Sequence, residues 1–381
     1  MSEEFPYTKL RAQLFDCELP SPLVLASGPR SYNAASIIEA YKAGAGAVVT
    51  KTLRSTLPVN PTPHLIKPSS KGSTNTLINA EEWSDISWEQ WVYEEIPMLE
   101  GHPGALIVSL GHTAQDIEKF IEPLADCETV DMIECVSYSG DSIIPLIAAV
   151  RSKTDLPILA KLSFNWGGEL FSIAETALNA GCDGFTAIDS VGPALYIDIE
   201  TGNPLLASEG GRGWISGAAI KPLAVSIVAE LKKRFNKPVV GTGGVFSAED
   251  IIEMTMAGAD AVGVCSAPIL YGNEWFTKTL HKLDRWLTEF DYTSLEEIVG
   301  YALTKLNSNQ ISSGLEFDFD PLLCTLCRRC VEVCPYNARQ ISGDSPRDRN
   351  IKMSLIREIC RSCGLCSSVC KPGSLTSKIK L

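Results

Sequence analysis

The chain has 381 residues, of which 45% are hydrophobic and 21% are charged, a composition typical of a globular protein and not of a disordered one. Its 46 acidic residues outnumber its 33 basic residues, and the net charge of −13 argues against nucleic acid or an anionic membrane as the main partner. The sequence has no recognisable signal peptide and no apolar run of the roughly 18 residues that span a bilayer, so we expect a cytoplasmic protein with no membrane contact.

Short apolar runs alternate with helical patterns over most of the chain. Because the runs are bounded by Gly or Pro, they indicate strands buried on both faces, at residues 22–27, 45–51, 105–110, 131–137, 157–162, 184–190, 238–243 and 261–266. Helices are expected at residues 33–43, 113–125, 169–180, 218–234 and 247–257. Eight strands alternating with helices predict an α/β fold, a (β/α)₈ TIM barrel, with a doubly wound open sheet as the alternative.

Several helix ends are marked by their residues. Ser247, followed by Glu249 and Asp250, is typical of an N-cap with acidic residues in the first turn. Three helices run into Ala-Gly, and the glycines that would end them are Gly44, Gly181 and Gly258.

Two insertions interrupt the barrel pattern, residues 53–104 after the second strand and residues 191–217 after the sixth. Long loops after barrel strands lie on the catalytic face, so both are candidate substrate covers; the alternative is a dimer contact or a hairpin. Residues 271–320 are polar and helical and are interpreted as a connector. We therefore place a barrel domain with its connector at 1–312 and a small domain at 313–381.

The small domain holds eight of the thirteen cysteines. They form two runs with C-x₂-C-x₂-C-x₃-C spacing, the first ending in Cys-Pro and the second with its proline one residue late, at Pro372. This spacing is typical of bacterial ferredoxins, in which the fourth cysteine of each run ligates the other cluster. Structural zinc is the alternative, but it does not explain two complete runs. The sequence predicts two [4Fe–4S] clusters, one on Cys324, Cys327, Cys330 and Cys370 and one on Cys360, Cys363, Cys366 and Cys334.

Charge is divided unevenly along the chain. Residues 321–381 contain eleven Lys or Arg and four Asp or Glu, a balance of +7, so the other 320 residues carry −20. Basic side chains near clusters offset thiolate charge and raise reduction potentials. The alternative interpretation is docking of a basic domain onto an acidic barrel.

Motifs on successive strands give the barrel a family resemblance. With the cysteine runs, the whole chain resembles the dihydroorotate dehydrogenase family, in particular the FMN and iron–sulfur part of dihydropyrimidine dehydrogenases. The motifs are Leu25-Ala-Ser-Gly-Pro29, Thr50-Lys-Thr52, Asn60-Pro-Thr-Pro63, Leu77-Ile-Asn79, Ala160-Lys-Leu162, Ser216-Gly-Ala-Ala-Ile-Lys-Pro222, Gly241-Thr-Gly-Gly-Val245 and Val264-Cys-Ser266.

The resemblance implies an FMN site at the carboxyl ends of the strands. Backbone amides of glycines and a following helix N-terminus supply a phosphate site there, and strand-end lysines can hold the flavin or stabilise negative charge on its reduced ring. The implied cofactor residues are Ala26, Ser27, Lys51, Thr52, Lys161, Gly217, Gly243, Gly244, Cys265 and Ser266.

The fourth strand departs from the family pattern. Aligning Asp131-Met-Ile-Glu134 places Ser139 where the family has its general acid/base, with Lys161 as the second catalytic residue. Tyr138 is a further proton donor to consider, whereas Cys135 falls within the strand and is interpreted as a packing residue. His112 follows the third strand and is placed where it can reach the site.

Recognition of substrate is expected to differ from that of the family. Val136 and Asp141 fall where the family has asparagines, and Asp189-Ser190 replaces an Asn-Thr pair. An amide donates and accepts, whereas an ionised carboxylate only accepts, so we expect a substrate with extra N–H donors or positive charge. The predicted substrate residues are Asn79, Glu134, Asp141, Asp189 and Ser190.

The predicted function is an FMN- and iron–sulfur-dependent oxidoreductase acting on a C–C bond of a small, pyrimidine-like heterocycle. The first βα turn, Ser27-Gly-Pro-Arg30, is not a dinucleotide motif, so the clusters are expected to exchange electrons with a protein partner. That partner would be a ferredoxin or an FAD/NAD(P) reductase subunit, and the chain itself is expected to form a homodimer. The alternatives are a dihydroorotate dehydrogenase of pyrimidine synthesis and a non-catalytic electron-transfer subunit.

Overall fold

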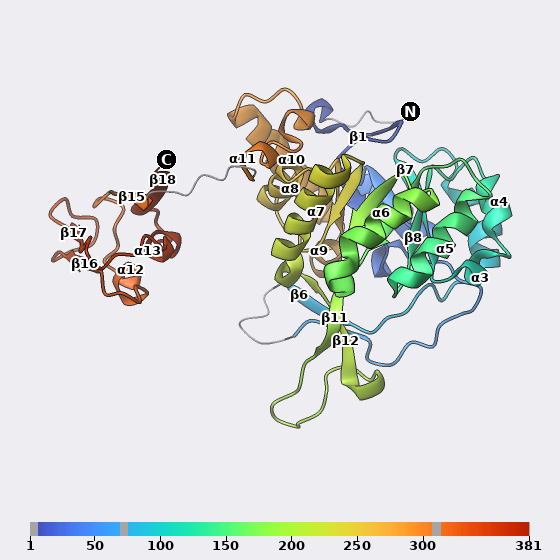
Figure 1. Cartoon of the computed structure of the whole chain (residues 1–381), viewed down its shortest axis with the longest axis horizontal. Coiled ribbons are helices and arrows are strands. Elements are labelled where there is room, and N and C mark those ends of the chain that lie inside the picture. Colours follow the sequence, from blue (N-terminus) through green and yellow to red (C-terminus); the bar gives the residue numbers. More distant parts are fainter. Residues whose placement is uncertain (1–6, 69–74, 307–313, 381) are drawn as a thin grey trace. The chain divides into compact units, whose positions relative to one another are not determined.

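Eight parallel strands close into a barrel in the N-terminal part of the chain (Figure 1). The computed structural model describes residues 7–68, 75–306 and 314–380. Around the barrel the strands follow one another in chain order, which confirms the (β/α)₈ prediction and excludes the open sheet. They are β3 (Leu23–Leu25), β4 (Ala47–Val49), β7 (Ala105–Gly111), β8 (Met132–Val136), β9 (Ile158–Leu162), β10 (Gly184–Ala187), β13 (Val239–Thr242) and β14 (Ala261–Val264).

The barrel strands coincide with the eight predicted apolar runs. Every residue of β7, β8 and β9 is buried, because one face of each strand fills the barrel and the other packs against the helices. Cys135 belongs to this hydrophobic core, as its place within the strand predicts. At one end of the barrel, β1 (Ala12–Leu14) pairs with β2 (Cys17–Leu19), and Leu14 and Leu19, one from each strand, pack into the interior layer of the strands.

Helices surround the barrel (Figure 1). The predicted helix at 113–125 is broken in two, and the one predicted from 218 begins with a 3₁₀ turn, Ala218–Ile220. Their bounds are α1 (Ala34–Ala43), α2 (Trp88–Gln90), α3 (Ala114–Ile117), α4 (Ile121–Ala125), α5 (Gly140–Arg151), α6 (Leu170–Ala180), α7 (Lys221–Phe235), α8 (Ala248–Met256), α9 (Ser266–Tyr271), α10 (Glu274–Glu289) and α11 (Leu303–Leu306).

The predicted helix ends are present. Ser247 caps α8 by accepting a hydrogen bond from the Asp250 amide. Gly44, Gly181 and Gly258 follow their helices with φ of 111°, 110° and 112°, the left-handed conformation that ends a helix before the next strand.

The two insertions meet in one sheet. Residues 53–104 supply β5 (Leu65–Ile66) and β6 (Thr76–Asn79), and residues 191–217 supply the hairpin of β11 (Val191–Leu195) and β12 (Arg212–Gly217). The strand order is β11-β12-β6-β5, so segments far apart in the sequence pair side by side, and the hairpin extends from one end of the barrel (Figure 1).

The segment interpreted as a connector, residues 271–320, divides between the two units of the chain. The helix α10 packs on the barrel through Phe276, Leu280, Leu283 and Leu287, so it belongs to the barrel unit. Its apolar residues recur at helical spacing and bury one face. Near its end, the segment supplies strand β15 (Gly314–Phe319) of the C-terminal unit, which pairs with β18 (Leu375–Lys380).

The chain divides into two compact units, Met1–Leu306 and Asn307–Leu381. The predicted boundary at 312/313 falls within 307–313, outside the described residues. The C-terminal unit contains β15, α12 (Arg329–Glu332), β16 (Arg339–Ser342), β17 (Lys352–Leu355), α13 (Leu365–Ser368) and β18. None of the helices in the described ranges is long and apolar enough to cross a membrane.

Candidate active site

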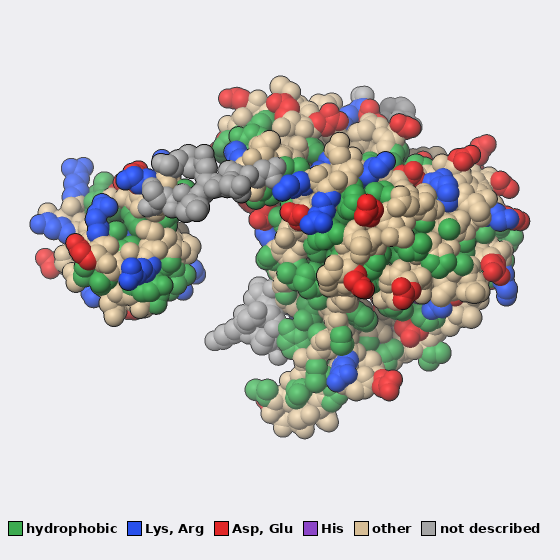
Figure 2. Space-filling view, in the orientation of Figure 1, with side chains coloured by type: hydrophobic (Ala, Val, Ile, Leu, Met, Phe, Trp, Pro, Cys, Tyr) green, Lys and Arg blue, Asp and Glu red, His purple; other side chains and the backbone are tan. Residues whose placement is uncertain are grey.

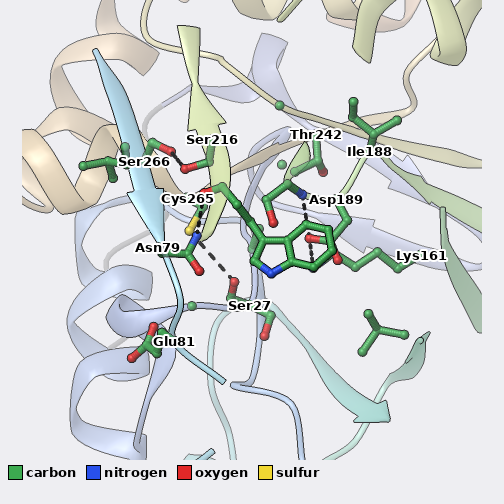
Figure 3. A pocket seen from close by; sticks show the side chains of 18 of the residues that line it. Ser27, Asn79, Glu81, Lys161, Ile188, Asp189, Ser216, Thr242, Cys265 and Ser266 are labelled. Carbon is green, nitrogen blue, oxygen red and sulfur yellow. Dashed lines mark hydrogen bonds and ion pairs between the residues drawn. The ribbon is translucent and has the colours of Figure 1, made fainter. Parts of the chain in front are cut away.

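A deep pocket opens at the carboxyl ends of the barrel strands (Figure 3). Residues directly after β3, β4, β9, β10, β13 and β14 line it, and the sheet formed by the two insertions closes one side. Because parallel strands deliver their last residues to the same end of a barrel, this end is where barrel enzymes place their chemistry.

The pocket brings together every predicted cofactor residue: Ala26, Ser27, Lys51, Thr52, Lys161, Gly217, Gly243, Gly244, Cys265 and Ser266. Of the predicted substrate residues, Asn79, Asp189 and Ser190 also line it. Glu134 lies behind Lys161, and Asp141 and Ser139 are not among the lining residues.

Three glycines form a cradle of exposed backbone at one end of the pocket. Gly217, Gly243 and Gly244 have φ of 89°, 130° and 75°, values that only glycine adopts without strain. A Cβ on Gly217 would lie 2.1 Å from the Asn75 carbonyl oxygen, and one on Gly244 would lie 2.7 Å from that of Gly217. Such close approach of bare backbone before α7 suits a phosphate group.

The serines beside the cradle reinforce it. Ser266, the first residue of α9, donates its hydroxyl to Ser216 Oγ at 2.9 Å, and this bond links the loop after β14 to strand β12 (Figure 3). Next to it, burial raises the pKa of the Cys265 thiol to about 11, so the thiol stays protonated at neutral pH. The glycines and hydroxyls therefore fit the phosphate end of FMN.

Lys161 is the buried cation at the centre of the pocket. It is the fourth residue of β9, and its Nζ lies 3.7 Å from Asp189 Oδ1 (Figure 3). The same Nζ lies 3.7 Å from Glu134 Oε1. Burial by itself lowers the pKa of Lys161, but the charges of Asp189 and Glu134 outweigh it and hold the pKa above its usual value. Lys161 is thus a fixed ammonium group.

A hydrogen-bonded chain runs from Glu134 to the pocket. Ser109 donates to Glu134 Oε1 at 3.2 Å, the hydroxyls of Ser109 and Thr52 lie 3.0 Å apart, and those of Thr52 and Ser27 lie 3.4 Å apart. Glu134 therefore acts on the pocket through Lys161 and these hydroxyls.

The second lysine is also paired. Lys51 Nζ lies 2.5 Å from Glu81 Oε1, and both side chains are largely buried. Glu81 follows β6, so this ion pair ties the first insertion to the end of β4. Sequence reasoning missed Glu81 because nothing in the loop itself indicates which strand it faces.

Aromatic rings cover the side of the pocket opposite the cradle. His112 and Tyr138 stack with ring centroids 4.1 Å apart, and Tyr138 stacks on Trp214 at 6.1 Å. Trp83 completes the set, with the Arg54 guanidinium 3.9 Å above its ring. The four rings come from four separate loops or strands, which is why sequence reasoning anticipated His112 and Tyr138 at the site but not the stack that they form with Trp214.

Ser139 occupies a structural position. It is the N-cap of α5, where its Oγ accepts from the Ser142 amide at 3.2 Å and donates to Ser142 Oγ at 3.0 Å. Asp141 lies in the first turn of the same helix. The neighbouring Ser137 and Tyr138 line the pocket instead, and partial burial raises the pKa of the Tyr138 phenol, which keeps it protonated.

The C-terminal unit gathers the cysteines in two groups. Cys334, Cys360, Cys363 and Cys366 line one cavity. The pKa of Cys330 is raised mainly by burial. The negative charges of Cys370, Cys324 and Cys327 raise it further, so these four thiols are neighbours as well. These are the two sets that the crossed ferredoxin pairing predicts.

The surroundings of the thiols suit clusters better than zinc. An iron–sulfur cube needs thiols around its corners, and the two complete four-cysteine runs supply them. Backbone amides point at the sulfurs, from Ala338 to Cys334 at 3.4 Å and from Leu375 to Cys370 at 3.3 Å. Figure 2 shows many Lys and Arg and few acidic side chains on this unit.

Comparisons with known proteins agree with both units. A family model described as dihydroorotate dehydrogenase matches residues 9–287, and one described as a 4Fe-4S dicluster domain matches residues 323–374. A relative from Methanothermobacter thermautotrophicus is 33% identical over 305 residues, which cover 77% of this chain and 98% of the relative. One from Thermococcus kodakarensis is 32% identical over 311 residues, with 77% and 98% covered.

Both relatives carry the name dihydroorotate dehydrogenase B (NAD(+)), catalytic subunit. Because the match takes up nearly all of each relative and leaves almost a quarter of this chain unmatched, this chain carries additional sequence that these relatives lack.

Proposed function

The chain belongs to the dihydroorotate dehydrogenase family, and we propose that it acts on an uncharged, pyrimidine-like ring and not on dihydroorotate. It is an oxidoreductase of CH–CH groups that binds FMN and two [4Fe–4S] clusters. The charge balance of the pocket indicates the substrate class.

Each ammonium group in the pocket already has an acidic partner. Lys51 is paired with Glu81, and Lys161 lies between Glu134 and Asp189. Among the described lining residues there is no other Lys or Arg, while Glu82 adds one more carboxylate. A ring bearing its own carboxylate, such as orotate, would enter without a free cation and beside several acids, which is unfavourable in a partly buried site.

The polar side chains that line the pocket suit a neutral cyclic amide. Asn79 offers both a donor and an acceptor, and the Asp189 carboxylate accepts from a ring N–H. Val136, at the end of β8, offers neither and leaves that edge apolar. The aromatic rings of Tyr138 and Trp214 provide flat surfaces for a planar ring.

FMN supplies hydride and single-electron chemistry when bound. The glycine cradle and Ser266 would hold its phosphate, and Lys51, Thr52 and Lys161 would hold its ring. The proton at the neighbouring carbon needs a donor from the chain. Ser139 was predicted for this role, and Tyr138 is the residue whose position in the pocket supports it.

The test is an anaerobic reoxidation assay. The purified protein, with FMN and both clusters present, is reduced with dithionite and mixed with uracil, thymine or orotate while the visible absorbance of the flavin is followed. We expect uracil or thymine to reoxidise it and orotate to leave it reduced. Equal reoxidation by orotate would contradict the proposal in favour of a dihydroorotate dehydrogenase, and no reoxidation by any ring would favour the electron-transfer subunit.

Two sets of variants sharpen the assay. Asp189→Asn should weaken discrimination between uracil and orotate by tenfold or more, because it replaces a negative charge with an amide. Each factor of ten corresponds to about 1.4 kcal/mol. The exposed Asp155→Asn is its control and should behave as wild type. Tyr138→Phe and Ser139→Ala, compared at equal FMN content, identify which hydroxyl moves the proton.

The electron partner belongs to the same proposal. Relatives named as catalytic subunits imply a partner subunit, and a dicluster domain is a conduit for single electrons. We expect a ferredoxin or an FAD/NAD(P) reductase subunit as that partner, a homodimer of the chain itself and a cytoplasmic location, where free thiols are maintained.

A further inference from the structure

A buried arginine lies between the two groups of cysteines. Arg339 is the first residue of β16, and only 4% of its surface is exposed. None of the ion pairs formed within the described ranges includes it. Burying a guanidinium without a carboxylate is unfavourable, so its charge must be balanced by something else.

The contacts of Arg339 identify the balancing charge. Its Nη2 donates to Cys366 Sγ at 3.2 Å, and its guanidinium carbon lies 4.3 Å above the Phe317 ring. Its Nε is buried with no acceptor. Arg339 lines one cavity with Cys334, Cys360, Cys363 and Cys366, so the groups around it that can carry negative charge are cluster ligands.

The two halves of the unit differ at this position. In the first half, Ala338 directs its amide to Cys334 Sγ, and Arg339 follows. In the second half, Leu375 directs its amide to Cys370 Sγ, and the exposed Thr376 follows. After the last cysteine of each run, the first half therefore has a buried cation and the second half has a neutral, solvated residue.

Hydrogen bonds to the sulfurs show the same asymmetry. The Cys324 and Cys370 sulfurs receive bonds from backbone amides, and Cys370 has the Ser374 hydroxyl beside it, all neutral groups. Cys366 alone among the described cysteines receives a bond from a charged side chain. A charged donor in a site from which water is excluded acts more strongly than a neutral one.

We propose that Arg339 sets the reduction potential of the cluster held by Cys334, Cys360, Cys363 and Cys366 above that of the other cluster. Reduction adds one electron, and hence one negative charge, to a cluster, and a buried cation in contact with a ligand sulfur stabilises the reduced form. An electron entering the unit would then rest on this cluster. The inference rests on the cluster content of the proposed function but not on its substrate.

A redox titration of the full-length protein tests the proposal. Iron and acid-labile sulfide are measured first, and the protein is then titrated anaerobically while the reduced clusters are followed by electron paramagnetic resonance. We expect two resolved steps in the wild type. In Arg339→Gln the higher step should move to lower potential while the lower step stays within its experimental error.

Arg361 provides a matched control. It is an arginine that lines the same cavity, but it is exposed, so water screens its charge. Arg361→Gln should shift the higher step much less than Arg339→Gln does. Equal shifts in the two variants would mean that overall charge, and not this buried contact, sets the potential.

Arg339→Lys keeps the test decisive if the glutamine variant fails to load its cluster. Lysine retains the charge but not the planar fork above Phe317, so the higher step should fall part of the way with both clusters present. Unchanged potentials in every loaded variant would overturn the proposal, as would iron analysis showing no second cluster in the wild type. Failure of the heterocycle assay would leave these results unaffected.

Discussion

Charged side chains in the pocket form pairs of opposite charge. Lys51 and Lys161 are strand-end cations whose charges are met by Glu81, Glu134 and Asp189 from other elements. The charges of Asp189 and Glu134 hold Lys161 as an ammonium group. Under the proposed function, the pairing also removes both lysines as partners for an anionic substrate.

His112 gives a prediction at the residue scale. Burial, assisted by the charge of Arg54, lowers the pKa of His112 to about 4. In the unfolded chain a histidine has a pKa of about 6.5 and takes up a proton below that pH. In the folded barrel the His112 ring stays neutral down to about pH 4. The free energy of unfolding should therefore decrease as the pH falls from about 6.5 to about 4, by up to about 3 kcal/mol. Above about pH 6.5 this contribution to stability should be fully present.

Urea unfolding at a series of pH values measures this effect. All seven tryptophans belong to the barrel unit, so their fluorescence reports on it alone. His112→Gln should flatten the pH dependence, whereas His281→Gln, at an exposed site, should leave it as in the wild type. The same slope in His112→Gln and wild type would show that another group titrates.

At the scale of elements, loops after successive strands build the two ends of the pocket. The turn after β13 meets the end of β12 in the glycine cradle, and the sheet of β11, β12, β6 and β5 forms the opposite side. The β12 strand takes part in both, since Trp214 belongs to the aromatic wall and Gly217 to the cradle. One strand thus links the phosphate end to the substrate end.

Gly244→Ala tests the cradle. A methyl group there would meet the Gly217 carbonyl oxygen at 2.7 Å and would require φ near +75°, a strain of roughly 1–2 kcal/mol. We expect FMN affinity to fall by about tenfold or more, measured by fluorescence on rebinding FMN to the apoprotein. Gly168→Ala is the control, because nothing lies within 4 Å of its added carbon. Equal FMN affinity in the two variants would argue against the cradle as the phosphate site.

At the scale of the whole molecule, the two units obtain their stability in different ways. The barrel unit has a continuous hydrophobic core drawn from its strands and helices. The C-terminal unit has only small apolar clusters, and cysteines make up part of each. A unit this small that buries Arg339 among thiols depends on its clusters to fold.

Removal of the clusters should therefore unfold one unit and spare the other. After oxidation and chelation of iron, we expect sites beyond residue 314 to become sensitive to protease, as mapped by mass spectrometry. The urea midpoint from tryptophan fluorescence should stay the same. Continued resistance of the C-terminal unit, with iron confirmed absent, would show that it folds without metal.

Local sequence determined the architecture and the cofactors. Apolar runs predict the buried parallel strands, and Ser247 and the terminal glycines predict helix ends. Both kinds of feature can be predicted because they depend on residues that are neighbours in the sequence. Cluster ligation follows from cysteine spacing for the same reason. The cofactor residues at the strand ends follow from the barrel, which carries every strand end to one face.

Tertiary structure alone decided which side chains pair with one another in the pocket. The Lys51–Glu81 pair and the Tyr138–Trp214 stack join residues from separate loops, and no local pattern encodes such contacts. After the end of β8, Tyr138 lines the pocket and the next residue, Ser139, caps α5. Sequence spacing fixes which residues are near one another along an element, whereas packing between distant elements fixes which side chains meet in the pocket.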